Sequence, residues 1–159
     1  MRPAPTRSEP RGHASDREQL SRAIELSRRC PPSTTAFSVG ALLVDAEGAE
    51  LATGFSREAD PAEHAEEAAL RKVDPADPRL AGATMYSSLE PCGARASRPR
   101  TCAELIIAAG VRRVVYALRE PTRFVDGQGD EMLRRDGVEV IELSDLAAPV
   151  REVNAHLLS

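Results

Sequence analysis

The chain has 159 residues and a formal net charge of −4, with 42% hydrophobic and 29% charged residues. This length suits one domain with a substantial core, and the composition is that of an ordinary globular protein. The acidic balance argues against a dedicated nucleic-acid-binding protein, and the absence of any run of 18 apolar residues argues against a membrane span.

The N-terminal region and the cysteine content indicate where the domain begins and in which redox compartment the protein works. Residues 1–14 are rich in proline, arginine and small residues without periodicity, so we expect a disordered tail followed by one domain over 15–159. The tail lacks the apolar segment of a secretory signal. Three cysteines, Cys30, Cys92 and Cys102, do not suggest a disulfide framework, which favours a reduced, cytoplasmic setting.

Hydrophobic periodicity and turn residues divide the domain into alternating helices and strands. The first helix is expected to be capped by Ser15 or Asp16. Helices are predicted at 15–29, 61–73, 102–109, 130–135 and 145–157, and strands at 39–45, 49–55, 84–89, 111–118 and 138–143. This order predicts an α/β fold, a three-layer α/β/α sandwich around a mixed sheet of about five strands.

Two segments together carry the pattern His-x-Glu … Pro-Cys … Cys. The first holds His64 and Glu66, and the second holds Cys92 and, after nine intervening residues, Cys102. Imidazole and thiolates bind Zn²⁺, and three protein ligands leave the fourth tetrahedral position for water, as in catalytic zinc sites. Glu66 is not needed as a ligand. We expect it to act as the general acid and base that moves protons between this water and a substrate.

Both segments are predicted to begin helices. Asp60 is a good N-cap residue, and Pro61 suits the first helical position. His64 and Glu66 then lie in or next to the first turn, where side chains two positions apart can converge on one ligand. The proline before Cys92 also suits a helix start, and the partial positive charge of a helix N-terminus favours a thiolate.

The same residues have three other interpretations. Two unrelated buried thiols with a surface histidine would be a coincidence of motif and spacing. A structural zinc would need a fourth ligand, and no further cysteine or histidine lies nearby in the sequence. A nucleophilic Cys-His pair would leave the second cysteine without a role. A catalytic Zn²⁺ site accounts for all four residues.

These motifs resemble the cytidine-deaminase-like superfamily, and within it the RibD-type pyrimidine deaminase domain of riboflavin biosynthesis. The similarity covers about residues 18–143. It rests on Val39-Gly40-Ala41, His64-Ala65-Glu66, Ser88-Leu89-Glu90-Pro91-Cys92, Arg98 shortly before Cys102, and Ala108-Ala109-Gly110-Val111. The wide spacing of the two cysteines is similar to the RibD-type domain, whereas other members usually have cysteines three positions apart.

The resemblance implies a cytidine-deaminase-like fold and a zinc-dependent hydrolytic deaminase. His64, Cys92 and Cys102 would bind zinc, and Glu66 would be catalytic. The first expected substrate is the riboflavin-pathway diaminopyrimidine ribonucleotide, and the alternative is a cytidine- or deoxycytidylate-type substrate or another amino-heterocycle of specialised metabolism. The resemblance also implies a homodimer or homotetramer, with water and a small molecule as its only other partners.

Two further expectations concern the limits of this activity. Only a short segment follows Leu143, so a stand-alone deaminase without the reductase domain is expected. A nucleic-acid-editing module is disfavoured by the acidic charge and by the scarcity of aromatic residues for base stacking, with three Phe, two Tyr and no Trp.

The substrate-facing positions depart from the RibD-type pattern. The family's Asn-Pro before Val-Gly is replaced by residues 36–38, and its Ser-His-His-Gly loop after the first cysteine is replaced by residues 93–97, one residue longer. Residues 37–41 are instead similar to the Phe-x-Val-Gly-Ala motif of free-nucleoside cytidine deaminases. These departures leave the identity of the substrate open.

Four residues are candidates for substrate binding by this resemblance. They are Phe37, Gly40, Ala65 and Arg98. Arg98 matches a basic position of the family and is a candidate phosphate ligand, with a solvated basic loop as the alternative. Gly40, like Gly54, also marks a place where a ligand or a neighbouring strand approaches the backbone closely.

Overall fold

The computed structural model describes residues 13–95, 98–119 and 129–158. Its centre is a five-stranded sheet of order β2-β1-β3-β4-β5. The strands are β1 (Gly40–Val44), β2 (Glu50–Phe55), β3 (Thr84–Leu89), β4 (Arg113–Leu118) and β5 (Glu139–Glu142). Strand β1 is antiparallel to β2 and β3, whereas β3, β4 and β5 are parallel. The predicted mixed sheet is confirmed.

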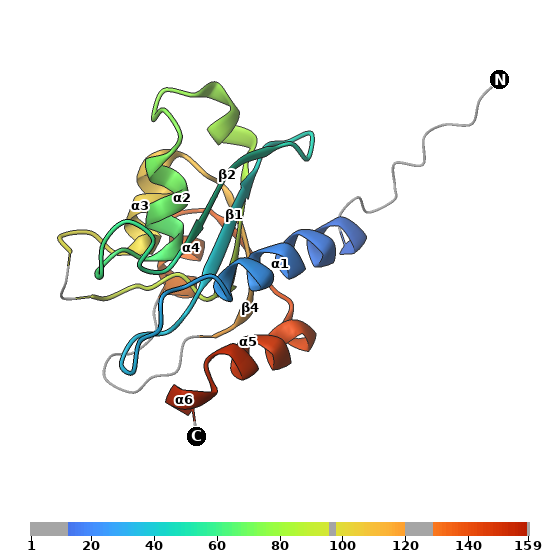
Figure 1. Ribbon diagram of the computed structural model, residues 1–159. Coiled ribbons are helices and arrows are strands. Elements are labelled where there is room, and N and C mark those ends of the chain that lie inside the picture. Colours follow the sequence, from blue (N-terminus) through green and yellow to red (C-terminus); the bar gives the residue numbers. More distant parts are fainter. Residues whose placement is uncertain (1–12, 96–97, 120–128, 159) are drawn as a thin grey trace.

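Helices cover both faces of this sheet (Figure 1). One face is covered by α1 (His13–Ser27) and α5 (Ala147–Val153), and the other by α2 (Ala65–Arg71), α3 (Cys102–Ala109) and α4 (Gly129–Arg135). The remaining helical segments are η2 (Pro78–Gly82), η3 (Ser144–Leu146) and α6 (Ala155–Leu158). None of the described helices is long and apolar enough to cross a membrane. The predicted three-layer sandwich is therefore confirmed.

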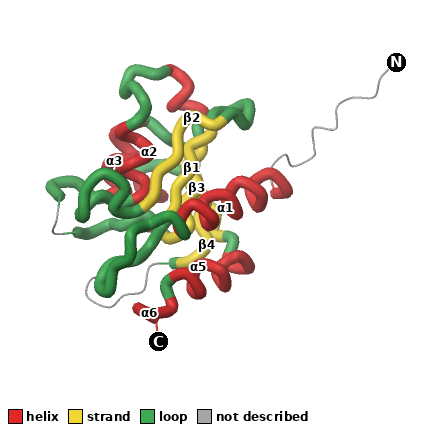
Figure 2. The backbone as a smooth tube through the Cα atoms, in the orientation of Figure 1, coloured by secondary structure: helices red, strands yellow, loops and turns green. Residues whose placement is uncertain are grey.

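Burial along the strands follows from this layering. Every residue of β1 and β3 is buried, as expected for strands covered on both faces. The edge strands β2 and β5 each carry exposed positions. Figure 2 shows the strands enclosed between the helices.

Two glycines let one helix rest directly on each face of the sheet. Gly40 lies opposite Phe55, and its neighbour Ala41 lies opposite Gly54. A Cβ atom on Gly40 would lie 1.9 Å from the carbonyl oxygen of Ala23 in α1, and a Cβ atom on Gly54 would lie 2.3 Å from the Ala65 oxygen in α2. The close approach predicted at these glycines is confirmed, but the approaching elements are helices.

The ends of the domain differ from the prediction. Helix α1 begins at His13, so residues 13 and 14 are helical, and residues 1–12 of the predicted tail lie outside the described part. Asp16 lies inside this helix instead of capping it. Its buried carboxylate accepts a hydrogen bond from Tyr86 (2.6 Å) and forms an ion pair with Arg113 (2.7 Å). These two interactions stabilise the fold more than a hydrogen bond to the helix N-terminus would. The last predicted helix is divided into η3, α5 and α6, with Asn154 between the last two.

We expect Gly54→Ala to destabilise the fold by about 1–3 kcal/mol and to weaken zinc binding, because the added methyl group displaces α2 and the residues at its start. Gly40→Ala is the matched control, since its clash is at least as severe (1.9 Å against 2.3 Å) but falls on α1. Thermal unfolding and chelator competition for zinc, on both variants, check this. Equal zinc affinity in the two variants would contradict the role assigned to Gly54.

Candidate metal centre

His64 lies at the start of α2 as its N-cap, with an extended backbone (φ −93°, ψ 161°). The Glu67 side chain accepts a hydrogen bond from the His64 backbone N–H (3.2 Å). The predicted start at Pro61 is wrong because Asp60 closes a separate turn. Its carboxylate accepts from the Ala62 N–H (2.8 Å), so its capping capacity is used before the helix begins. The expectation that His64 and Glu66 flank the helix start is confirmed.

Cys92 and Cys102 are brought together by a loop and a helix start. Cys92 follows β3 in a loop, so the predicted helix at Pro91 is wrong. Helix α3 begins at Cys102 and is capped by Thr101, whose hydroxyl accepts from the Glu104 N–H (3.2 Å). The Cys102 backbone N–H donates to the Cys92 sulfur (3.3 Å). The helix N-terminus that favours the Cys92 thiolate is therefore that of α3.

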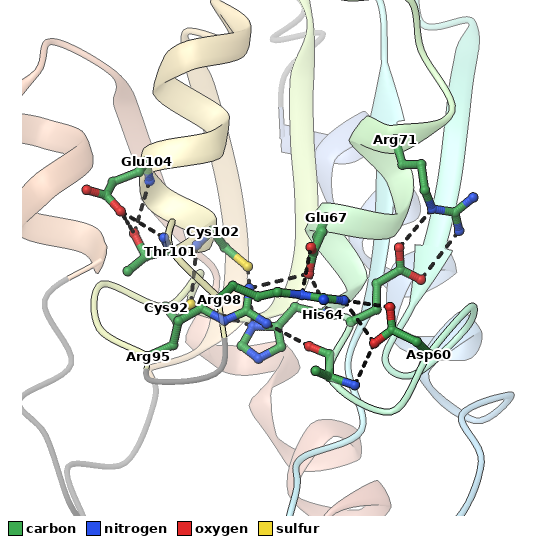
Figure 3. A network of polar contacts seen from close by, with 12 residues as sticks. Asp60, His64, Glu67, Arg71, Cys92, Arg95, Arg98, Thr101, Cys102 and Glu104 are labelled. Atoms are coloured by element: carbon green, nitrogen blue, oxygen red, sulfur yellow. Dashed lines mark hydrogen bonds and ion pairs between the residues drawn. The ribbon is translucent and has the colours of Figure 1, made fainter.

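The three predicted ligands form one cluster (Figure 3). The Nδ1 atom of His64 lies 3.3 Å from the Cys102 sulfur and 3.6 Å from the Cys92 sulfur. All three donor atoms lie within 4.8 Å of one another. Donors on a tetrahedral zinc, with bonds of about 2.0–2.3 Å, are separated by about 3.5 Å. The spacing and the His-Cys-Cys donor set both fit a zinc ion.

Without a metal, the two cysteine thiols of the cluster differ in their tendency to lose a proton. The hydrogen bond from Cys102, with further help from His64, lowers the pKa of Cys92 to about 4. The same hydrogen bond and burial raise the pKa of Cys102 well above its ordinary value. Burial lowers the pKa of His64, but its hydrogen bond to Cys92 and the Cys92 charge outweigh this and leave that pKa raised. The pair of thiols therefore carries one thiolate before metal binds.

Glu66 lies beside the cluster and is almost completely buried, with 3% of its surface exposed. Burial raises the pKa of its carboxyl group. The Ser87 hydroxyl lies 2.8 Å from Glu66 Oε2 and 2.7 Å from the Leu89 carbonyl oxygen. A hydroxyl has one proton, so Ser87 can donate to Leu89 while accepting from protonated Glu66, or donate to ionised Glu66. The site thus accommodates both protonation states of Glu66.

A cavity of about 430 Å³ opens onto this centre. His64, Glu66 and Cys92 line one side of it, and Thr35 and Phe37 belong to the segment that lines another. This volume lies within the range of small-molecule sites, about 300–1,000 Å³. The donor cluster and the buried carboxylate are therefore accessible to a small ligand.

The structure separates the four predicted substrate-binding residues. Only Phe37 lines the cavity. Gly40 lies beneath α1, and the Ala65 methyl group is buried in the core. Arg98 lies outside the cavity lining, and its guanidinium donates to both carboxylate oxygens of Asp60 (2.6 and 2.8 Å).

Arg95 and Arg98, from the loop between β3 and α3, bind residues just before and within the first turn of α2. Arg98 Nε lies 3.1 Å from the Glu67 carboxylate, and Arg95 donates to the Ala62 carbonyl oxygen (2.6 Å) (Figure 3). The Arg95 side chain is 4% exposed. The positive charge that suggested a phosphate site is thus already paired within the protein at Arg98.

Residues 13–118 match the family described as the cytidine and deoxycytidylate deaminase zinc-binding region. The chain belongs to this family. A Schizosaccharomyces pombe protein named diaminohydroxyphosphoribosylamino-pyrimidine deaminase is 39% identical over 128 residues, which cover 79% of this chain and 31% of that protein. The chain spans about a third of the length of this relative and of the RibD relatives it matches.

Two solved structures extend this similarity to the fold. The Thermotoga maritima diaminohydroxyphosphoribosylaminopyrimidine deaminase/5-amino-6-(5-phosphoribosylamino)uracil reductase has a TM-score of 0.78 and 34% identity, covering 89% of this chain and 39% of that chain. The C-terminal deletion mutant of Aspergillus oryzae Rib2 deaminase has a TM-score of 0.66 and 26% identity, covering 91% and 99%. The predicted superfamily and its RibD-type branch are confirmed.

Zinc uptake by the metal-free protein is expected to release protons, because zinc binds thiolates and neutral imidazole. The two thiols together contribute one proton at pH 7, because the pair carries one thiolate before metal binds, and His64 contributes an increasing fraction as the pH falls. Zinc affinity should therefore decrease toward acid.

Calorimetry in buffers of different ionisation enthalpy measures this proton release. At pH 7 and above, zinc uptake should release about one thiol proton per zinc. Release of about two thiol protons, or of none, would contradict the single thiolate assigned to the pair.

Proposed function

We propose that this chain is a zinc-dependent hydrolytic deaminase that removes the amino group from an aminopyrimidine ring. The observation that carries the proposal is a cluster of three zinc-ligand residues, two of which, His64 and Cys92, line a cavity together with the buried Glu66 carboxylate. The names of the S. pombe and T. maritima relatives support the diaminopyrimidine ribonucleotide of the riboflavin pathway as the first candidate substrate.

The residues of the site have different roles in hydrolysis. His64, Cys92 and Cys102 would hold the zinc ion, which supplies Lewis acidity and lowers the pKa of water at catalytic sites. Glu66 would accept one proton of the attacking water and deliver it to a ring nitrogen, and would then accept the second proton of that water and deliver it to the leaving amine. One water is consumed, the ring carbon exchanges its C–N bond for a C–O bond, and ammonia leaves.

The environment of Glu66 suits this role. Because burial raises its pKa, Glu66 can hold a proton closer to neutral pH than an exposed carboxyl group can. Ser87 supplies a hydrogen-bond partner in either protonation state. Phe37 and Leu89 provide apolar surface in the cavity against which a planar ring can pack.

Cytidine-type substrates are the second candidate, favoured by Phe37 at the cavity wall where the RibD-type pattern has Asn-Pro. A phosphate-binding role for Arg98 stays a prediction, and it requires the guanidinium to exchange Asp60 for the ligand. We further propose that the protein acts as a homodimer or homotetramer. A reducing compartment such as the cytoplasm would keep the ligand thiols available for zinc.

Glu66→Gln is expected to keep about one zinc per chain and to lower ammonia release by about 10²- to 10⁴-fold, because the amide cannot carry the proton. Release is measured on the diaminopyrimidine ribonucleotide, its unphosphorylated counterpart, cytidine and deoxycytidylate. The wild-type protein should prefer the diaminopyrimidine ribonucleotide.

Glu131→Gln is the matched control, because it makes the same substitution on an exposed side chain of α4 that does not line the cavity. Its turnover should stay within a few-fold of wild type. Full turnover by Glu66→Gln would exclude the assigned proton transfer. Preference for a cytidine would replace the first candidate substrate with the second.

A further inference from the structure

One wall of the cavity has no regular secondary structure. Residues 31–38, here called the coil wall, connect α1 to β1 without helix or strand. Thr35, Ala36 and Phe37 of this wall line the cavity. Because no ladder or helical hydrogen bonds hold such a segment, its position depends on side-chain hydrogen bonds. The Ser33 hydroxyl accepts from two backbone N–H groups within it, and the other bonds come from outside the segment.

Asn154 supplies two of these hydrogen bonds from the far end of the chain. Its Oδ1 accepts from the Ser38 backbone N–H (2.7 Å), and its Nδ2 donates to the Ser38 carbonyl oxygen (3.1 Å). The amide therefore pairs with both backbone groups of Ser38, as a neighbouring strand would. Asn154 is 0% exposed and also donates to the Val150 oxygen (3.1 Å), which ties it to α5.

Arg57 holds the coil wall from another side. Its guanidinium donates to the Phe37 oxygen (3.0 Å), the Pro31 oxygen (2.7 Å) and the Ser38 hydroxyl (3.0 Å). Arg57 itself lines the cavity and has a left-handed backbone with φ of 62°. Asn154 does not line the cavity, so any effect it has on a ligand must pass through Ser38 and its neighbour Phe37.

We propose that Asn154 is a positioning residue of the substrate cavity, which fixes the coil wall at Ser38 and so makes ligand affinity depend on the junction between α5 and α6. An amide is required here because it offers one donor and one acceptor in a fixed fork. The part of this inference that concerns substrate rests on the proposed deaminase function. The part that concerns the coil wall does not.

Asn154→Ala is expected to raise KM about tenfold, the effect of losing buried hydrogen bonds that order a binding wall, with kcat and zinc content within about twofold of wild type. Backbone amide exchange in residues 31–39 should accelerate by at least a similar factor. Asn154→Asp keeps the acceptor for the Ser38 N–H and loses the donor, so it should change both quantities in the same direction.

Val150→Ala is the matched control. Val150 lies on the same helix and is 1% exposed, so the truncation lowers stability without removing a bond to the coil wall. It should lower the unfolding temperature while leaving KM and exchange in residues 31–39 unchanged.

Two results would overturn the proposal: wild-type KM and exchange in Asn154→Ala, or the same changes in Val150→Ala. Failure of the deaminase function would instead be seen as an inactive wild-type protein. The exchange comparison would still decide whether Asn154 holds the coil wall.

Discussion

Three donor atoms from distant parts of the chain must meet within 4.8 Å, and the described architecture serves this constraint. His64 caps α2, Cys92 lies in the loop after β3, and Cys102 begins α3. Helices α2 and α3 pack together on one face of the sheet. Because Gly54 has no side chain, the backbone of α2 lies directly against the backbone of β2. Close packing of a helix pair on a rigid sheet therefore fixes where a metal ion can bind.

The electrostatics of the site follow from this packing. The first amide of α3 donates to the Cys92 sulfur, so one thiolate is stabilised before any metal arrives. The second thiol, on Cys102, is buried and keeps its proton until a cation displaces it. Glu66 is buried in the same region and binds its proton more tightly than an exposed carboxyl group does. One cavity thus borders both the metal site and the proton carrier, at His64, Cys92 and Glu66.

The His-Cys-Cys cluster and the strands were predictable because their signals are local. Metal-ligand types at a specific spacing and uninterrupted apolar runs need no knowledge of distant residues. The helix start at His64 was not predictable, because Asp60 is also a favourable N-cap residue. In the structure, the Asp60 carboxylate closes a separate turn before the helix. The pairing of Arg98 with Asp60 and the bond between Asn154 and Ser38 join segments whose proximity depends on the whole fold. No periodicity in the sequence encodes such contacts.

Zinc-edge X-ray absorption of the reconstituted protein tests the central claim most directly. The account predicts one zinc per chain surrounded by two sulfur atoms at about 2.3 Å and two lighter atoms at about 2.0–2.1 Å, one of them from imidazole. Cys92→Ala and Cys102→Ala should each remove one sulfur atom from this shell or abolish binding. A shell without two sulfur atoms, or one unchanged when either cysteine is removed, would contradict the assignment of His64, Cys92 and Cys102 as the metal centre.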